Sequence, residues 1–556
     1  MTQAVTLLQT DRADIGRKIE TRELADLPLL MNRNFQGLLN LVPGTSRVFR
    51  PHSEFFNAQD SISTQVNGQS RMANNVQFEG IDNNHRTGLL TALIPPIEAL
   101  QTVDITTSNF EAELGRAGGA VTNITLKSGS NDWHGSAYEF NRVSATAARN
   151  VFALTRPPTV FNLFGANLGG PILKNRTFFF VNYQGIRDRR GDVTRATIPT
   201  LEFRRGDLGA STTTIYDPNT GNSDGTGRVP FAGNIIPESR ISPIARKILA
   251  LVPPPTFSGL VSNYERATVR KKDTDSIDFK IDHQVHRNDT FSFRYSLQEP
   301  EIFDPSLFGI YGGPKRGGFA GFGTQRAQNG AINYTRIFSQ TFLAELRIGV
   351  MRYRNDAKNE DTGRDTSREL GIPGANLGDP VTSGISTFDV DGFSNPVVGF
   401  DGALPWARAE TNFDFVQNWT KIAGNHTLKW GADIRRNRDD LFTGGWPIGS
   451  RGRFTFRAGP TARNGDLRTS FGNSFASFLL DLPNAVGRGL AGQWSSLRQT
   501  TLFTYVQDKW QVSPKLTLDL GLRHELWFNP TPANPGGFSN YNPRTNSLEI
   551  AGIGSV

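Results

Sequence analysis

The chain has 556 residues with 57 glycines, 31 prolines and only 37% hydrophobic residues, a composition typical of many strands and turns and not of a helical core. It contains no cysteine, which excludes a disulfide framework and any cysteine-ligated zinc or iron–sulfur site. The net charge of +8 comes from basic residues scattered along the sequence, so we expect no nucleic-acid groove.

The start of the sequence lacks the usual export signal. Residues 1–18 have neither the basic beginning nor the apolar core of a signal peptide. No apolar run in the chain approaches the ~18 residues that a membrane-spanning helix requires. We therefore expect no transmembrane helix and no export signal within this sequence.

The first region, which ends near Ser128, is predicted to be a small α+β unit. Residues 21–44 show helical spacing of apolar side chains and end in a Pro-Gly stop. Residues 63–84 are typical of short strands joined by Asn-Gly and Glu-Gly turns. A short helix from Pro96 and a strand over residues 103–107 follow.

The stretch FEAELGRAGGAVTNITLKSGSN (residues 110–131) is unusual because two glycines precede a strand. Gly118 and Gly119 give the backbone freedom before a polar, alternating strand over residues 121–127. A Ser-Gly-Ser-Asn turn ends the strand. From these residues alone, an ordinary strand with a bulge is an equally good interpretation.

From about Asp132 onward the sequence is a long series of segments that alternate apolar and polar residues. Examples are SIDFKID (276–282), TFSFRYSLQ (290–298), HTLKWGADIRRNR (426–438) and KLTLDLGLRHE (515–525). We find about a dozen such segments, most close to the length that a tilted strand needs to cross a bilayer.

Alternation alone does not separate a membrane barrel from a soluble sheet, which also has one apolar face. Two features favour an antiparallel transmembrane β-barrel. The apolar faces are rich in aromatic residues and leucine, with Trp419, Trp430, Trp510 and Trp527 near strand ends, and the opposite faces carry charges that suit a wet lumen. A soluble sandwich or propeller remains the alternative, although no 40-residue period supports a propeller.

No convincing catalytic, cofactor or metal site is found. Residues 221–225 match the G-x-S-x-G pattern, but they lie in a turn-rich loop without the required strand and helix. Nearby Asp217, Asn219 and Asp224 lack calcium-loop spacing, and His283 and His286 flank a hairpin turn. We predict that the chain is not an enzyme.

Two loop segments have local character of their own. Residues 242–255 (SPIARKILALVPPP) predict a short helix capped by Ser242, with Pro243 in its first turn. Its Ile244, Ile248 and Leu251 are expected to pack on another surface, and a role in gripping the substrate is the alternative. Residues 312–323 are expected to form a long flexible loop.

Several ordered motifs match one family. They are VNGQSRMANNVQFEGIDNN (66–84), IEALQTVDITTSNFEAELGRAGGAVTNITLKSGSNDWHGSAYEF (97–140), FGANLGGPILKNRTFFFVNYQGIR (164–187) and YVQDKWQVSPKLTLDLGLRHE (505–525). Together they resemble the Oar-like TonB-dependent outer-membrane receptors, over nearly the whole chain from about Thr10 to Pro530.

The resemblance implies a plug domain over residues 10–128, followed over residues 129–556 by the N-terminal part of the transmembrane β-barrel. The polar strand after the two glycines would be the last plug strand, bathed by a wet lumen. The candidate hinge between plug and barrel consists of Gly118, Gly119, Ser128 and Gly129.

The sequence also departs from the family pattern. Glu79-Gly80 stands where the family usually has Asp-Gly. The signal peptide, the small β-sandwich resembling the carboxypeptidase regulatory domain and the TonB box are not recognised. Family barrels have about 22 strands, so we expect the chain to be a fragment, truncated at both ends.

The function implied by the resemblance is that of an outer-membrane receptor and transporter. It would bind an extracellular ligand and pass it through the plugged barrel, using energy from the TonB complex. Its partners would be outer-membrane lipid, the TonB complex and a ligand of unknown type, with no nucleic acid and no cofactor. The alternatives are a structural or adhesion barrel without transport and a secreted β-rich enzyme.

Overall fold

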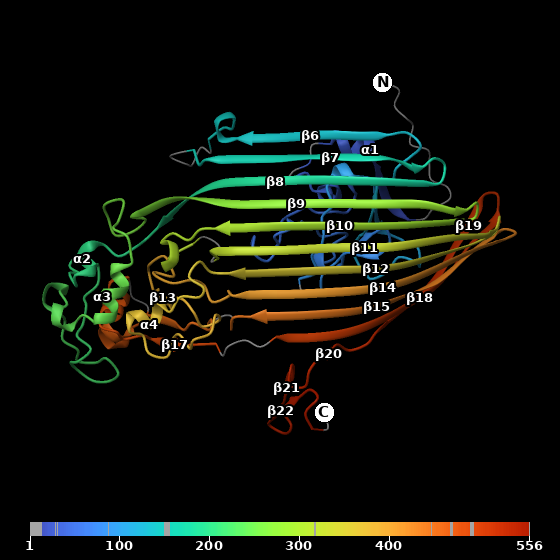
Figure 1. Ribbon diagram of the computed structural model, residues 1–556. Coiled ribbons are helices and arrows are strands. Elements are labelled where there is room, and N and C mark those ends of the chain that lie inside the picture. The colour runs from blue at the N-terminus through green and yellow to red at the C-terminus, as the bar shows by residue number, and fades with distance from the viewer. Residues whose placement is uncertain are drawn as a thin grey trace.

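The computed structural model describes residues 14–554, except positions 28, 30–31, 87, 150–155, 316–318, 446–447, 468–470 and 490–493. The fold is mainly β, as the alternating sequence predicts, and most strands belong to two sheets of unequal size (Figure 1). None of the helices in the described part of the chain is both long and apolar enough to cross a membrane.

The N-terminal region forms the smaller, five-stranded sheet, in the order β1-β4-β5-β2-β3. Its strands are β1 (Ile15–Glu20), β2 (Asn75–Phe78), β3 (Ile81–Asp82), β4 (Leu100–Ser108) and β5 (Val121–Leu126). The helices around it are α1 (Thr21–Asp26) and the 3-10 helices Phe35–Leu41, Arg71–Ala73 and Ile97–Ala99. Apolar side chains of helix and sheet, such as Phe35 and Ile124, share one core. We call this unit the plug.

Two local sequence signals shape the plug. The apolar spacing after residue 34 gives a 3-10 helix, and Asn34 caps it by accepting a hydrogen bond from the backbone of Gln36 at 2.9 Å. Glu79 and Gly80 both have positive φ angles, 50° and 80°, and form the tight turn between β2 and β3. Such a turn matches the twist of a hairpin.

The larger sheet contains twelve strands, and neighbouring strands pair antiparallel. It is curved and open, with β6 and β19 at its two edges, and β20 pairs with β18. The strands are β6 (His134–Val143), β7 (Thr159–Leu173), β8 (Thr177–Ala196), β9 (Tyr264–His286), β10 (Asp289–Asp304), β11 (Gly321–Ser339), β12 (Phe342–Lys358), β14 (Trp406–Ala423), β15 (His426–Thr443), β18 (Ser495–Ser513), β19 (Leu516–Trp527) and β20 (Thr531–Pro532).

The two faces of this sheet have reversed polarity compared with a soluble protein. On β9, Asp278 and Lys280 are buried on the inner face, whereas Ile277 is 41% exposed on the outer face. On β14, Asp414 is buried and Phe413 and Phe415 are exposed. Because charged residues point inward and apolar ones outward, the outer face suits lipid and not water.

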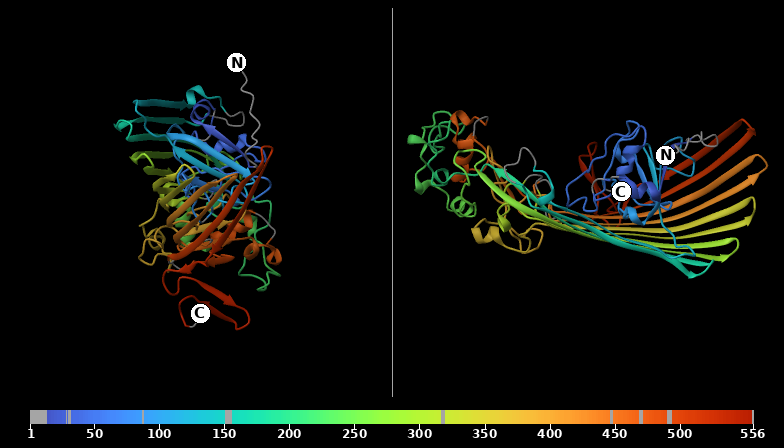
Figure 2. Two further views of the ribbon diagram at one scale, coloured as in Figure 1. Left: turned by 90° about the vertical axis from the view of Figure 1, so that its right-hand side faces the viewer. Right: turned by 90° about the horizontal axis from the view of Figure 1, so that it is seen from above.

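The plug lies against the concave, inner face of the larger sheet (Figure 2). β3 contacts β12 and β14 directly. The change from one sheet to the other falls between β5 and β6, whereas the domain limits of residues 10–128 and 129–556 stay a prediction.

The connections at the two ends of the large sheet differ in length. At one end, tight turns join β7 to β8, β9 to β10, β11 to β12, β14 to β15 and β18 to β19. At the other end, long connections gather into a separate lobe (Figure 1). In outer-membrane barrels the short turns face the periplasm and the long loops face outward, so the resemblance to that class places the lobe on the extracellular side.

This loop lobe has a hydrophobic core of its own, which includes Ile248, Phe388, Phe456 and Phe475. Its helices are α2 (Leu201–Arg204), α3 (Pro243–Ala250), α4 (Thr366–Leu370) and α5 (Phe471–Leu479). Its sheet consists of β13 (Thr387–Val390), β16 (Arg453–Phe456) and β17 (Ala485–Gly487). Further 3-10 turns lie at Ala232–Asn234, Glu238–Arg240, Gly309–Tyr311, Gly459–Thr461 and Arg463–Gly465. A 3-10 turn at Ser144–Thr146 follows β6, and β21 (Ser539–Asn542) and β22 (Ser547–Ile550) form a C-terminal hairpin.

Helix α3 forms as predicted from sequence. Ser242 caps it by accepting hydrogen bonds from the backbones of Ile244 and Ala245, and Pro243 occupies the first turn. Ile248 is buried in the loop core, and Ile244 and Leu251 pack against that core. The surface on which these side chains pack is therefore the loop lobe.

Candidate functional site

The plug is attached to the large sheet by buried charges. Asp82 at the end of β3 is fully buried, 3.0 Å from the Arg116 guanidinium of the plug and 3.3 Å from that of Arg435 on β15. Its backbone N–H also donates to Asp414 of β14 at 2.7 Å. Burial acts to raise the pKa of Asp82, but Arg116, Arg435 and Arg86 lower it, so the carboxylate stays ionised.

A second buried cluster forms at the β2–β3 turn. Glu79 lies 2.8 Å from the Lys280 ammonium of β9 and 3.4 Å from the Arg294 guanidinium of β10. Glu79 also accepts a hydrogen bond from the backbone of Leu126 at 3.1 Å. Arg294 in turn donates to the carbonyl of Phe78 and stacks over its ring at 3.9 Å. Glu79 thus connects the plug hairpin both to β5 and to the wall.

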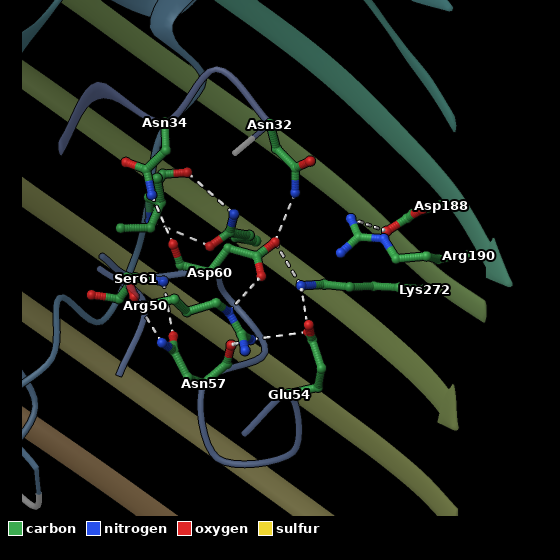
Figure 3. Close-up of polar contacts among 12 residues, drawn as sticks. Asn32, Asn34, Arg50, Glu54, Asn57, Asp60, Ser61, Asp188, Arg190 and Lys272 are labelled. Carbon is green, nitrogen blue, oxygen red and sulfur yellow. Dashed lines mark hydrogen bonds and ion pairs between the residues drawn. The ribbon is translucent and has the colours of Figure 1, made fainter. Parts of the chain in front are cut away.

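A third cluster, on the plug loop of residues 50–61, is shown in Figure 3. Lys272 of β9 reaches into it and lies 2.6 Å from Asp60 and 3.4 Å from Glu54. Arg50 bridges the same two carboxylates at 3.2 and 2.9 Å. Burial acts to raise the pKa of Glu54, but Lys272, Arg50 and Arg270 together lower it to about 2.

A cavity of about 240 Å³ opens between the plug loops and the extracellular ends of the strands. Its walls are largely apolar and aromatic: the lining residues are His52, Phe56, His85, Gly88, Leu90, Phe319, Asn355, Ala403, Trp406 and Arg408. The ring of Phe56 contacts those of Trp406 and Phe319, with centroids 4.8 and 5.2 Å apart.

Polar groups at one side of this cavity complete its chemistry. Arg408 pairs with Glu410 and donates to His85 at 2.9 Å. Within the described part of the chain, the buried Nε of Arg408 and the indole N–H of Trp406 have no hydrogen-bond partner. Burial lowers the pKa of His52, and nearby arginines lower it further, so His52 is neutral at pH 7. The cavity therefore suits a molecule with an apolar body and an acceptor group.

The candidate hinge residues separate into two places. Gly118 and Gly119 donate to the carbonyl of Ala73 at 2.9 and 3.1 Å, and a side chain on Gly119 would clash with Asn74, so both pack within the plug. Gly129 instead lies against the wall, where a Cβ would meet the carbonyl oxygen of Gly170 at 2.7 Å. Of these three glycines, Gly129 is the one that packs against the wall, and the hinge role of the four residues stays a prediction.

Ser128 and Gly129 also line a cavity of about 560 Å³ between the plug and the first barrel strands.

The strand that follows the two glycines, β5, packs within the plug. β5 lies in the middle of the plug sheet, and Ile124 and Leu126 are fully buried in its core. Asn123 and Thr125, on the opposite face of β5, are half-buried. One face of the strand thus packs within the plug, and the prediction of a wet lumen at the other face stays a prediction.

The other sequence candidates do not form a site. Residues 221–225 lie in a loop of turns without a flanking strand or helix. His283 contacts Thr177 at 2.9 Å on the neighbouring strand, and no group of three or more metal-binding side chains occurs among the described residues. The 312–323 segment lies partly outside the described residues, and β11 begins within it at Gly321.

A curved antiparallel sheet with a lipophilic outer face, a charged inner face and a small domain held against that inner face is the architecture of a plugged outer-membrane β-barrel. The chain belongs to the outer membrane beta barrel domain family, whose sequence model matches residues 125–556. The outer membrane is accordingly its location.

Comparison with named proteins supports the same assignment. The chain is 31% identical over 160 residues to the TonB-dependent transporter Oar of Myxococcus xanthus, a match that covers 27% of this chain and 14% of that protein. This similarity confirms the resemblance to Oar-like receptors. Both this relative and the ferric citrate transporter FecA, a solved structure of similar fold, are transporters, in agreement with the prediction that the chain is not an enzyme.

Solved structures show the same fold. The outer membrane transporter YddB from Escherichia coli superposes with a TM-score of 0.52 at 11% identity, over 93% of this chain and 57% of that one. The ferric citrate transporter FecA in the unliganded form gives 0.51 at 11% identity, over 97% of this chain and 59% of that one. The chain thus spans less than two thirds of the length of these proteins.

Proposed function

We propose that this chain forms the plug and part of the wall of a TonB-dependent receptor that binds an extracellular ligand and passes it through the barrel. The observation that carries this proposal is the cavity between plug and wall on the extracellular side. A ligand bound there contacts both the plug loop at Phe56 and the wall at Trp406. Binding of the ligand can therefore change the contacts between plug and wall.

The way in which the plug is held supports an external source of energy. Asp82 and Glu79 form buried ion pairs with wall residues, and Glu54 forms a half-buried one. Breaking a buried pair while one charge stays buried costs about 3–5 kcal/mol. Several such pairs keep the plug in place until something pulls on it, which is the role that we assign to the TonB complex.

Transport can be tested before the ligand is identified. Cells that lack this gene and cells that lack TonB are grown in the same rich medium, and compounds left in the medium are measured by mass spectrometry. We expect at least one compound to remain in the medium of both deletion strains and to be depleted by the wild type. If no compound behaves in this way, the protein is not a TonB-dependent importer.

Point variants connect the same assay to the cavity. Arg408→Gln and Trp406→Ala should leave that compound in the medium, because each removes a group that lines the cavity. Arg354→Gln, on the outer face at the same end of the sheet, should deplete the compound as the wild type does. Equal uptake by all three variants would remove the cavity from the proposal.

The loop lobe favours one second candidate, a structural or adhesion barrel that transports nothing. Its hydrophobic core makes it a rigid extracellular surface. In that case deletion of the gene should reduce attachment of cells to surfaces or to one another, whereas deletion of TonB should not.

A further inference from the structure

The outer face of the large sheet changes from apolar to charged on the extracellular side of the lipid-facing residues. On β12, the exposed Ile348 and Val350 are followed on the same face by Arg352. On β15, the exposed Ile434 is followed on the same face by Arg436 and Arg438. This charged band therefore begins at the border of the bilayer, on the side of the outer leaflet.

Between β8 and β11 three arginines of the band form ion pairs with carboxylates on adjacent strands. The three pairs are Arg187–Asp275 at 2.9 Å, Arg189–Asp273 at 2.6 Å and Arg326–Glu299 at 3.0 Å. These three arginines therefore already have carboxylate partners.

Between β12 and β18 the band contains arginines that lack a carboxylate partner among the described residues. Arg352, Thr411 and Arg438 occupy one row across β12, β14 and β15, and Arg498 of β18 extends the row. Arg498 pairs with Asp440 at 2.8 Å, whereas neither Arg352 nor Arg438 forms an ion pair within the described residues. Like charges side by side on a sheet repel each other, so this row lacks an anion.

The geometry of the row leaves room for that anion. Thr411 and, one step further along the same face, Ala409 are small, so β14 is a shallow recess between two strands that carry arginine. Strands lie ~4.8 Å apart, which places the backbones of Arg352 and Arg438 roughly 10 Å from each other. The guanidinium of Arg438 lies 5.4 Å from the ring centroid of Phe413, a lipid-facing residue.

We propose that Arg352, Thr411 and Arg438 bind a phosphate group on the headgroup of an outer-leaflet lipid. Guanidinium groups bind phosphate through paired, charge-assisted hydrogen bonds, and the Thr411 hydroxyl adds a donor. Lipid is the source of the phosphate because the row continues the lipid-facing surface without a gap. A lipid so bound would stay with this side of the barrel.

The test uses the full natural protein, folded in detergent, and titrates it with bisphosphorylated lipid A or with the same lipid after removal of its phosphates. The wild type should prefer the phosphorylated form. Arg352→Gln/Arg438→Gln should weaken that binding about tenfold or more, because each basic residue near a membrane surface adds affinity for anionic lipid. Inorganic phosphate alone should compete poorly.

The matched control is Arg187→Gln/Arg189→Gln, which changes two outward arginines of the same band that already have carboxylate partners. It should bind phosphorylated lipid as the wild type does. If the glutamine variant of the row fails to fold, Arg352→Lys/Arg438→Lys keeps the charge and should bind more weakly than the wild type. Equal binding by wild type and row variants, or equal binding of dephosphorylated lipid, would overturn the proposal.

Discussion

At the scale of single residues, Asp82 connects plug and wall through a cluster of buried charges. Replacing it by asparagine leaves Arg116 and Arg435 buried without their shared carboxylate. We expect Asp82→Asn to lower the free energy of unfolding by about 3–5 kcal/mol, measured by urea unfolding of the protein in detergent.

The matched control is Asp275→Asn. Asp275 forms an ion pair with Arg187 on the outer face, where both side chains are at least one third exposed. Pairs of this kind contribute about 0–1 kcal/mol. If Asp275→Asn lowers the free energy of unfolding as much as Asp82→Asn does, the buried cluster contributes no more than an exposed ion pair.

Glu54 makes the attachment of the plug loop sensitive to acid. Its pKa in the folded protein is about 2, below the ordinary value of 4.5. The stability that it contributes, at most about 3 kcal/mol, is therefore complete above pH 4.5 and lost as the pH falls from 4.5 towards 2. The protection factors of residues 50–61, which are hydrogen-exchange rates corrected for the intrinsic effect of pH, should fall over this range.

Glu54→Gln tests the assignment of this pH dependence. The variant should exchange faster than the wild type at pH 7, and its protection factors should change less between pH 4.5 and 2. The same acid response in variant and wild type would assign the effect to other carboxylates.

Gly129 and Gly118 provide a direct comparison of two candidate hinge positions. A methyl group at Gly129 would collide with backbone oxygens of β7 and β8, whereas at Gly118 its nearest neighbour is 3.6 Å away. Gly129→Ala should lower stability by about 1–3 kcal/mol and Gly118→Ala by less than 1 kcal/mol. Thermal unfolding measures both, and the reverse order would contradict the packing at residue 129.

At the scale of elements, the alternation along β19 defines which side meets lipid. Arg523 donates to plug carbonyls at 2.9 and 3.2 Å, and Gly521 lies against Ala112, so these residues face inward. Leu520 and Leu522, 56% and 71% exposed, therefore face outward. This agrees with the register expected from the sequence.

We expect Leu520→Arg to cost about 2–4 kcal/mol, because it places a charge on the lipid face. Thr517→Arg, on the opposite face, should cost much less. Unfolding in lipid vesicles measures the difference, and a lipid-restricted quencher should reach a label at 520 and not at 517. Quenching at 517 alone would mean that the register is inverted.

The strands could be predicted because one face of each is apolar and the other polar over many residues. The contacts of the plug could not be predicted. Asp82 and Arg435 lie far apart in sequence, and nothing local in either segment indicates how the plug docks. The cavity could not be predicted for the same reason, because its lining residues come from distant segments between His52 and Arg408.

At the scale of the whole molecule, the loop lobe is the part that sequence reasoning missed. Apart from helix α3, segments such as residues 197–263 contain many turns, and their buried residues follow neither a period of two nor a helical period. The sequence of residues 312–323 predicts a flexible loop, yet Ala320 is buried in the lobe core. A core assembled from several loops has no local pattern that reveals it.

Because this lobe has its own core, it should unfold separately from the barrel. Phe475 of α5 is fully buried in that core, and Phe475→Ala should destabilise the lobe by about 3–5 kcal/mol. Phe257, which is exposed, provides the control as Phe257→Ala. Limited proteolysis should cleave the first variant within the loops and leave the strands intact. Loss of the whole barrel instead would show that lobe and wall are one cooperative unit.

The length of β9 has a consequence for the cell surface. Its 23 residues span about 75 Å along the strand, or about 50 Å in height if it is tilted by ~45°, whereas the apolar band of such barrels is ~25 Å tall. The wall therefore extends roughly 25 Å above the bilayer, and the lobe lies at the outer end of its strands. Large bodies that cannot approach the lipid, such as antibodies or bacteriophages, meet this protein first at residues of the lobe.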